Sequence, residues 1–418
     1  MNPFAYKGSE LYAEDVSLAD IAAEQGTPTY VYSRAALTHA YTAFTAAFAG
    51  HDHLICYAVK ANSSLAILDL FARLGSGFDI VSGGELARVL AAGGDPGKIV
   101  FSGVGKSEAA IRAALEAQIL CFNVESASEL ARVNRIAGEL GVRASVSLRV
   151  NPDVDAGTHP YIATGLKQNK FGIAYADAPA LYGRARDLPH VLITGIDCHI
   201  GSQLTELAPV AEAMTKIAEL VARLEAMGIE LKHVDVGGGI GIRYRDETPP
   251  AITDYAAAVL SSFGNGRYKL LFEPGRVLTG NAGLLLTRIE YLKAGEERNF
   301  AIIDAAMNDL VRPSLYDAWH DVLPVRVNDS TTDTALSYDV VGPVCETGDF
   351  LARDRQLAVR EGDLLAIMSA GAYGMSMASN YNSRPRAAEV LVDGDTTLFI
   401  REREELSDLI ARERRLPA

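Results

Sequence analysis

The chain has 418 residues, a formal net charge of −14 and 49% hydrophobic residues. This length allows a barrel of about 250 residues and a second domain, and the acidic balance argues against nucleic acid or an anionic membrane surface as a partner. The four cysteines, Cys56, Cys121, Cys198 and Cys345, are widely spaced, which predicts reduced thiols in a cytoplasmic protein and no metal site. We find no signal-peptide pattern in the first ten residues and no apolar run of membrane-spanning length.

Helical and strand-like patterns alternate from residue 35 onward, whereas the residues before about 34 are expected to be irregular apart from a short strand at 29–32. The predicted strands are 55–60, 77–82, 99–103, 119–125, 144–151, 192–201, 233–239 and 268–276. Helical patterns between them include 64–74, 84–92, 108–117, 126–140 and 208–227. Eight strands with intervening helices over about 250 residues predict a (β/α)8 barrel. A doubly wound sheet would normally carry a glycine-rich loop after its first strand, where this chain has a lysine.

The alternation with helices stops after about residue 283. Strands are predicted at 284–292, 299–304, 334–341, 356–359, 364–369, 387–392 and 396–401, with a charged helix at 404–414. Turn-rich links separate several of them, which is typical of an all-β, Greek-key-like domain. The predicted organisation is an N-terminal segment (1–34) that joins the β domain, a barrel (35–282) and a C-terminal β domain (283–418).

Lys60 is the first candidate catalytic residue along the chain, because it is a charged residue that ends an apolar strand. Desolvation lowers the pKa of an ammonium group and makes the amine nucleophilic, as Schiff-base chemistry requires. A lysine whose stem merely lies along apolar surface is the plain alternative.

Residues at the later strand ends favour the chemical interpretation, because barrel chemistry occurs at the carboxyl ends of the strands. His199 could lie on an aromatic cofactor, with Ser202 as a nearby donor, or could simply be satisfied by a carbonyl group. The glycines Gly237, Gly238 and Gly239 could approach a phosphate or form a plain turn. Glu273 and Arg276, three residues apart, are either a structural ion pair or a ring-nitrogen partner and a carboxylate fork.

Three motifs follow the barrel. Arg312 and Tyr316 lie near one another on an apolar segment, Cys345 and Glu346 share a glycine-flanked loop, and Tyr373 lies between glycines. Each alone is compatible with a structural role, but their order after a lysine-tipped barrel points to one common site.

Together, these motifs resemble the fold-type III decarboxylases that depend on pyridoxal 5'-phosphate (PLP), and within them the diaminopimelate decarboxylases. The resemblance extends over essentially the whole chain. It rests on residues 57–62, 199–202, 237–239, 273–276, 307–309, 312–316, 345–346 and 373, and also on 161–165 and 169–172.

The resemblance implies a role for each cofactor residue. Lys60 would hold PLP covalently, His199 would stack on its ring and Glu273 would pair with the ring nitrogen. The phosphate would be held by a larger group: Ser202, Gly237, Gly238, Gly239, Gly275, Arg276 and Tyr373.

The resemblance also implies how a small amino-acid substrate binds. Arg276, Arg312 and Tyr316, with Tyr373 beside them, would bind the carboxylate of the distal stereocentre. Glu346 of a partner subunit would take the distal ammonium group, and Cys345 from the same loop would reprotonate the reacting carbon. The expected assembly is therefore a homodimer with shared active sites.

The expected reaction is decarboxylation of meso-2,6-diaminopimelate to L-lysine and CO2, the last step of lysine biosynthesis. One alternative is a decarboxylase of lysine, ornithine, arginine or carboxynorspermidine, which would not need Arg276, Arg312 and Glu346 together. The other alternative is a non-catalytic PLP-binding homologue, which would have no reason to keep Cys345 and Tyr373.

Overall fold

The computed structural model describes residues 2–154, 170–264, 266–327 and 335–417. The motif at 161–165, residue 169 and the start of the strand predicted at 334–341 lie outside this part of the chain. The chain divides into two compact units, one of residues 40–242 and 247–277 and the other of residues 1–39, 243–246 and 278–418.

Eight parallel strands close into a barrel in the first unit, because each strand pairs with two neighbours and the last, β13, pairs with the first, β5. The strands in barrel order are β5 (His53–Ala58), β6 (Gly77–Ile80), β7 (Ile99–Phe101), β8 (Cys121–Val124), β9 (Ala144–Asn151), β11 (Val191–Asp197), β12 (His233–Asp235) and β13 (Lys269–Phe272). A two-residue strand, β10 (Ile173–Ala174), adds to β9. Most strand residues are buried, as expected for parallel strands covered by helices. The predicted (β/α)8 barrel is confirmed.

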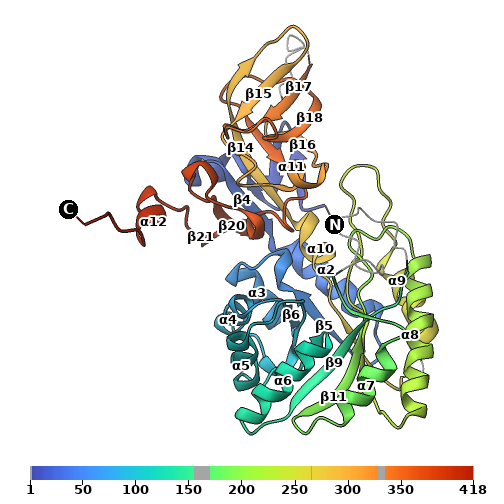
Figure 1. Cartoon of the computed structure of the whole chain (residues 1–418). Coiled ribbons are helices and arrows are strands. Elements are labelled where there is room, and N and C mark those ends of the chain that lie inside the picture. Colours follow the sequence, from blue (N-terminus) through green and yellow to red (C-terminus); the bar gives the residue numbers. More distant parts are fainter. Residues whose placement is uncertain (1, 155–169, 265, 328–334, 418) are drawn as a thin grey trace. The chain divides into compact units, whose positions relative to one another are not determined.

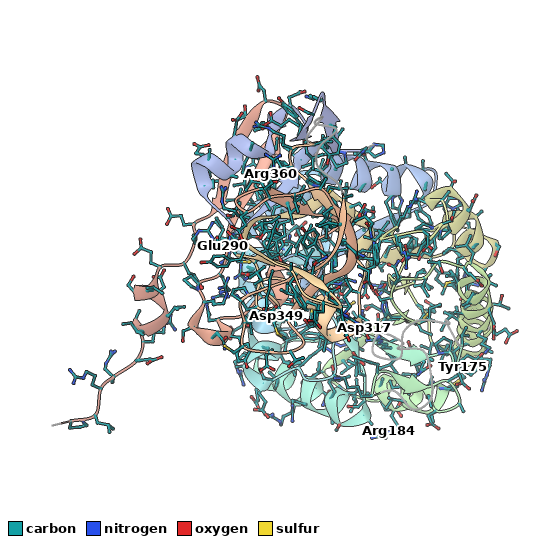
Figure 2. All side chains as sticks on the ribbon, turned by 90° about the horizontal axis from the view of Figure 1, so that it is seen from above. Tyr175, Arg184, Glu290, Asp317, Asp349 and Arg360 are labelled. Carbon is teal, nitrogen blue, oxygen red and sulfur yellow. The ribbon has the colours of Figure 1, made fainter. Side chains whose placement is uncertain are left out.

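Helices surround the barrel strands (Figure 1). They are α3 (Leu65–Arg73), α4 (Gly83–Ala91), α5 (Glu108–Glu116), α6 (Ala127–Glu139), α7 (Ala178–Arg186), α8 (Ala208–Ala226) and α9 (Ile252–Phe263), and α2 (Arg34–Ala47) precedes β5. Ser82, Ser107 and Ser126 cap α4, α5 and α6 by accepting a backbone N–H in the first turn. Exposed side chains of this layer, such as Arg184 on α7, point outward (Figure 2). No helix in the described ranges combines the length and the apolar character needed to cross a membrane.

Seven of the eight barrel strands, all except β9, end earlier than the sequence pattern predicts, and four of these lead directly to predicted site residues. β5 gives way at Val59 to a 3₁₀ turn, η1 (Val59–Ala61), β11 ends at Asp197, β12 at Asp235 and β13 at Phe272. After β12, the φ of +73° at Gly237 takes the backbone out of the extended region. The predicted site residues of the barrel therefore lie on the segments that follow the strands, at the carboxyl end of the barrel.

The other unit is built on a nine-stranded mixed sheet with the order β18-β17-β15-β14-β4-β20-β21, to which β19 and β16 add beside β14. Its strands are β4 (Thr29–Ser33), β14 (Gly283–Lys293), β15 (Asn299–Ile303), β16 (Val322–Pro324), β17 (Leu336–Val341), β18 (Phe350–Leu357), β19 (Leu364–Ile367), β20 (Ala388–Asp393) and β21 (Thr396–Arg401). The N-terminal strand β4 lies between β14 and β20. Its core includes Val31, Leu284, Leu286 and Val390, which are fully buried.

Both ends of the chain differ from expectation. The first residues are not irregular: β1 (Phe4–Lys7), β2 (Glu10–Ala13) and β3 (Val16–Ser17) form a small sheet, and α1 (Leu18–Gln25) follows. The elements form because Leu11 and Ala13 are buried and the Ser17 side chain caps α1. The charged C-terminal helix shortens to α12 (Leu406–Ile410), which has no buried residue and hence no packing to extend it.

Candidate active site

Lys60 lies in η1, directly after β5. Its Nζ is 2.7 Å from Oδ2 of Asp79, on the neighbouring strand β6. The Asp79 side chain is fully buried, whereas 37% of the Lys60 side chain is exposed. A buried carboxylate thus positions an accessible amine at the carboxyl end of the barrel, where barrel chemistry occurs.

The segment Glu273–Gly275 lies against the turn that carries Lys60. The N–H of Ala58 donates to the carbonyl of Pro274 at 3.1 Å. A Cβ on Gly275 would lie 2.9 Å from the Cβ of Ala61, closer than real Cβ contacts. Glycine is therefore required for the end of β13 to approach the lysine turn this closely.

His199 follows β11 and is half-buried. Its Nδ1 accepts the N–H of Gly238 at 3.1 Å, so the proton of the neutral ring is on Nε2. Burial lowers the pKa of His199 well below its ordinary value of 6.5, and the positive charges of Arg149 and Lys60 act in the same direction. The imidazole is therefore neutral at physiological pH.

The three glycines after β12 form a turn with no room for side chains. A Cβ would lie 2.1 Å from the carbonyl oxygen of Glu273 at Gly238, and 2.2 Å from that of Gly201 at Gly239. The N–H of Gly237 donates to Oδ1 of Asp235, and that of Gly238 donates to His199. Two of the three amides predicted to hold phosphate thus have acceptors within the protein, and the turn brings the loops after β11 and β13 together.

Arg276 begins the short helix α10 (Arg276–Thr279) and is 6% exposed. Its Nη2 donates to Oγ of Ser202 at 3.1 Å. This hydrogen bond links the loops that follow β13 and β11, and it brings two of the predicted phosphate ligands together.

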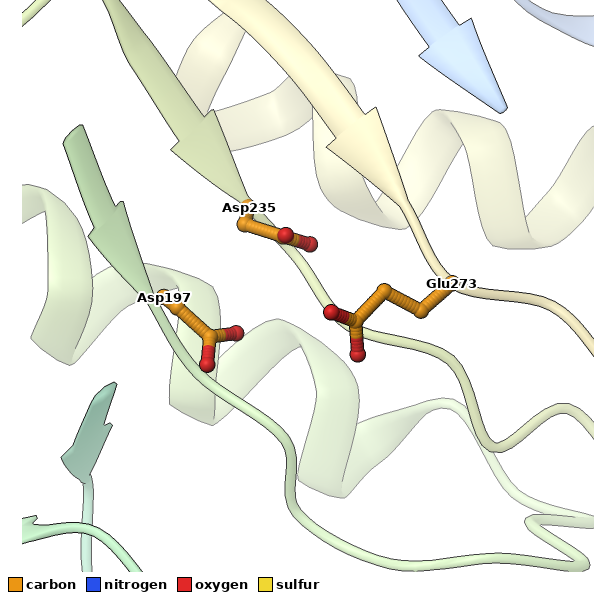
Figure 3. Close-up of side chains that lie close together, drawn as sticks. All are labelled: Asp197, Asp235 and Glu273. Atoms are coloured by element: carbon orange, nitrogen blue, oxygen red, sulfur yellow. The ribbon is translucent and has the colours of Figure 1, made fainter. Parts of the chain in front are cut away.

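Three buried carboxyl groups lie beside these loops. Asp197 ends β11, Asp235 ends β12 and Glu273 follows β13, and oxygen atoms of the three lie within 4.8 Å of one another. Figure 3 shows their side chains pointing toward each other. Burial raises the pKa of all three well above the ordinary values, and the negative charge of a neighbour in the cluster raises each further. The cluster therefore retains protons that exposed carboxyl groups would lose.

Polar side chains from neighbouring strands complete this cluster. The amide of Asn123 donates to Oδ2 of Asp235 at 3.3 Å and to Oε1 of Glu273 at 3.2 Å. Oγ of Ser102 also donates to Oε1 of Glu273, at 3.1 Å, and Nε of Arg149 lies 4.0 Å from Oδ2 of Asp197. These hydrogen bonds fix the orientation of the Glu273 carboxyl group.

The sequence prediction missed Asp79, Asn123, Arg149, Asp197 and Asp235 as members of the site. Asp79 and Asn123 are single polar residues in otherwise apolar strands, whereas Arg149, Asp197 and Asp235 share their buried strands with other polar residues. That pattern is the available signal, because a polar residue in a buried barrel strand must find a partner inside the protein.

The raised pKa values predict how stability depends on pH. A carboxyl group with a raised folded-state pKa stabilises the fold fully below its unfolded pKa of about 4, and this contribution is lost as pH rises through the folded value. We therefore expect the free energy of unfolding of the cofactor-free protein to decrease above about pH 5, and to decrease less in Asp235→Asn. Urea titrations at stepped pH measure both slopes, and a slope in the variant equal to that of the wild type would contradict this account.

The remaining predicted residues lie in the other unit. Arg312 and Tyr316 are the first and last residues of α11 (Arg312–Tyr316). Arg312 is buried, and its guanidinium Cζ lies 4.6 Å from the ring centre of Tyr244. Nη1 of Arg312 is 2.8 Å from Nε2 of His320. The arginine is thus a buried cation held by neighbouring rings.

Cys345 and Glu346 lie in the loop between β17 and β18, and both are exposed. The N–H of Cys345 donates to Oδ1 of Asn382 at 3.1 Å, and the hydroxyl of Tyr381 donates to Glu346. Buried Asp349 accepts two backbone N–H groups at 2.7 and 2.8 Å and so anchors the base of the loop. A thiol and a carboxylate are thereby presented together on an ordered surface loop.

Tyr373 is half-buried and has a φ of +56°. An aromatic side chain in the left-handed region is strained, and such residues cluster at functional sites. The following residue must be glycine, since a Cβ on Gly374 would lie 2.6 Å from the carbonyl oxygen of Ala370.

The structure thus brings the predicted barrel residues together around Lys60. In the other unit, Oγ of Ser314 on α11 donates to the carbonyl of Gly348 at 2.7 Å, which joins the helix of Arg312 to the loop of Cys345.

Three comparisons relate this geometry to known proteins. The family model described as "pyridoxal-dependent decarboxylase, pyridoxal binding domain" matches residues 34–280. The diaminopimelate decarboxylase of Pseudomonas aeruginosa is 59% identical over 417 residues, which cover 100% of both chains. The solved structure of diaminopimelate decarboxylase from Helicobacter pylori, complexed with L-lysine, is 44% identical with a TM-score of 0.90 and covers 94% of this chain and 98% of that one.

A more distant structure shares the fold alone. Lysine/ornithine decarboxylase from Vibrio vulnificus, complexed with putrescine, has a TM-score of 0.79 at 20% identity and covers 90% of this chain and 98% of that one.

Proposed function

The chain belongs to the diaminopimelate decarboxylases, a group of pyridoxal-dependent decarboxylases, and we propose that its barrel holds pyridoxal 5'-phosphate on Lys60. Its reaction is the decarboxylation of meso-2,6-diaminopimelate to L-lysine and CO2, the last step of lysine biosynthesis. The observation that carries the proposal is the Lys60–Asp79 ion pair of 2.7 Å at the end of the barrel.

The residues around Lys60 fit this cofactor. The pyridine nitrogen needs a proton-carrying partner, and Glu273 is a buried carboxyl group with a raised pKa. A flat ring needs a flat, uncharged neighbour, and His199 is a half-buried neutral imidazole. The phosphate needs a backbone that it can approach closely, which Gly239 provides, and a positively charged side chain, which Arg276 provides.

Bound PLP supplies a conjugated ring that accepts the electron pair left when the substrate carboxylate departs as CO2. Glu273 holds a proton at its carboxyl oxygen, and Asn123 and Ser102 keep that group in one orientation. The neutral ring of His199 places no second positive charge near this proton. Lys60 would hold the cofactor through Nζ.

Charged and aromatic side chains would select the substrate. We assign the distal carboxylate to Arg276, Arg312 and Tyr316, with Tyr373 beside them, because a guanidinium binds a carboxylate through two parallel hydrogen bonds. Glu346 would pair with the distal ammonium group. A substrate that lacks either group would leave a charge unpaired, which gives strong discrimination.

Cys345 would return the proton to the reacting carbon from Sγ, as a general acid. Cys345 and Glu346 are exposed on one chain, and we assign them to the active site of a partner subunit in a homodimer. Exposure of two reactive side chains on an anchored loop is the observation that supports this assignment.

The substrate assignment predicts a selectivity that is simple to measure. CO2 release should be rapid with meso-diaminopimelate and at least about 100-fold slower, in kcat/KM, with L-lysine, D-lysine, L-ornithine and L-arginine, which lack the distal amino-acid head. Comparable turnover of any of these would favour a decarboxylase of another basic amino acid. A bound, Lys60-linked cofactor without any turnover would favour a non-catalytic homologue.

A further inference from the structure

Buried His320 makes two hydrogen bonds that fix both of its ring nitrogens. Nδ1 lies 2.8 Å from the carbonyl oxygen of Met368, and Nε2 lies 2.8 Å from Nη1 of Arg312. The side chain has no exposed surface, so no water competes for these bonds. His320 is therefore part of the immediate surroundings of Arg312, although no sequence pattern singles it out.

The two partners dictate the tautomer of the ring. A carbonyl oxygen only accepts, so Nδ1 must carry the proton that it donates to Met368. A guanidinium only donates, so Nε2 must be the bare nitrogen that accepts from Arg312. Only the neutral Nδ1–H tautomer can make both bonds.

The face of a second ring, that of Tyr244, contacts the same guanidinium. The Cζ of Arg312 lies 4.6 Å from the ring centre of Tyr244, and the rings of Tyr244 and His320 meet edge to face, with centres 5.4 Å apart and an angle of 76°. The contact with the face of Tyr244 and the hydrogen bond to His320 hold the guanidinium from two sides and so restrict its orientation.

The backbone of His320 is itself fixed. Nη2 of Arg355 donates to the carbonyl oxygen of His320 at 2.9 Å, and the guanidinium of Arg355 lies 3.2 Å from the ring centre of Trp319. A guanidinium whose plane and direction are set beforehand binds a carboxylate through two parallel N–H groups at a lower entropic cost.

We propose that His320 and Tyr244 are positioning residues that orient Arg312 to receive the distal carboxylate of the substrate. The proposal rests on the function proposed above for Arg312. It predicts an effect on substrate binding and not on the cofactor or on the chemical step.

Two substitutions at His320 separate its two hydrogen bonds. In His320→Asn the amide nitrogen can take the place of Nδ1 and still donate to Met368, but nothing replaces Nε2. In His320→Gln the amide oxygen can reach the place of Nε2 and accept from Arg312. We expect the KM for meso-diaminopimelate to increase about 10- to 100-fold in His320→Asn and less than about 3-fold in His320→Gln.

In both variants kcat and the absorbance of the Lys60-linked cofactor should stay close to wild type. A second pair tests the proposal should the His320 variants not fold: Tyr244→Leu should increase KM by about 10-fold, whereas Tyr244→Phe, which keeps the aromatic face, should not. An unchanged KM in folded His320→Asn would overturn the proposal. It would also be overturned if both members of a pair showed the same decrease in kcat and the same increase in KM. If the wild type itself does not decarboxylate meso-diaminopimelate, the proposed function fails instead.

Discussion

Lys60→Ala is expected to lose decarboxylation by at least about 10³-fold, together with the absorbance of the covalently held cofactor. The substitution removes the amine that lies 2.7 Å from Asp79 and leaves that fully buried carboxylate without its cation. We therefore also expect Lys60→Ala to unfold at a lower temperature than the wild type.

Lys60→Arg separates these two effects. Arginine keeps a cation opposite Asp79 but does not lose its proton and so is no nucleophile. The variant should be as inactive as Lys60→Ala while it melts close to the wild type. Activity near wild type in Lys60→Arg would show that the covalent link is made elsewhere.

The same substitution tests whether subunits share their active sites. Lys60→Ala and Cys345→Ala should each be inactive, but co-expressed subunits should form mixed dimers in which one of the two sites has both residues. With equal expression half of the dimers are mixed, so about a quarter of the wild-type activity should return. Absence of any recovery would mean that each chain supplies both residues to one site.

Arg312→Met is expected to lower kcat/KM for meso-diaminopimelate about 10²- to 10³-fold, mainly through KM. Arg312 is 6% exposed, so a carboxylate bound there would be left without a partner in a site that excludes water. Methionine keeps most of the volume and removes only the charged fork.

Arg312→Lys is the matched control. It keeps the charge but replaces the planar fork with a single ammonium group, and we expect it to recover only part of the loss. The cofactor absorbance should be unchanged in both variants. A loss of cofactor, or an unchanged KM in Arg312→Met, would place Arg312 outside the substrate-binding site.

The sequence predicts the barrel well because its strands are apolar runs separated by amphipathic helices. Both patterns depend only on residues that are close together in the sequence. It does not predict where the strands end, since the turn after β12 depends on the positive φ of Gly237 and on the closeness of Glu273 to Gly238. The short N-terminal strands were missed because two to four residues are too few for a periodic pattern to stand out.

The sequence singles out Lys60, His199 and Glu273 because each lies near the carboxyl end of a predicted strand. It does not show that Asp79 faces Lys60 or that His320 faces Arg312, because partner residues are set by the pairing of strands and loops and not by spacing along the chain. A lone polar residue in a buried strand indicates that it has a partner inside the protein, but only the fold identifies that partner.

The most direct test of the whole account is analysis of the product that the PLP-loaded wild-type protein forms from meso-diaminopimelate, with chiral separation of the lysine. We predict equimolar CO2 and lysine, with the lysine entirely in the L form and absent with Lys60→Ala. Formation of D-lysine would mean that the distal head is bound at the opposite stereocentre, and formation of no lysine at all would contradict the assigned reaction.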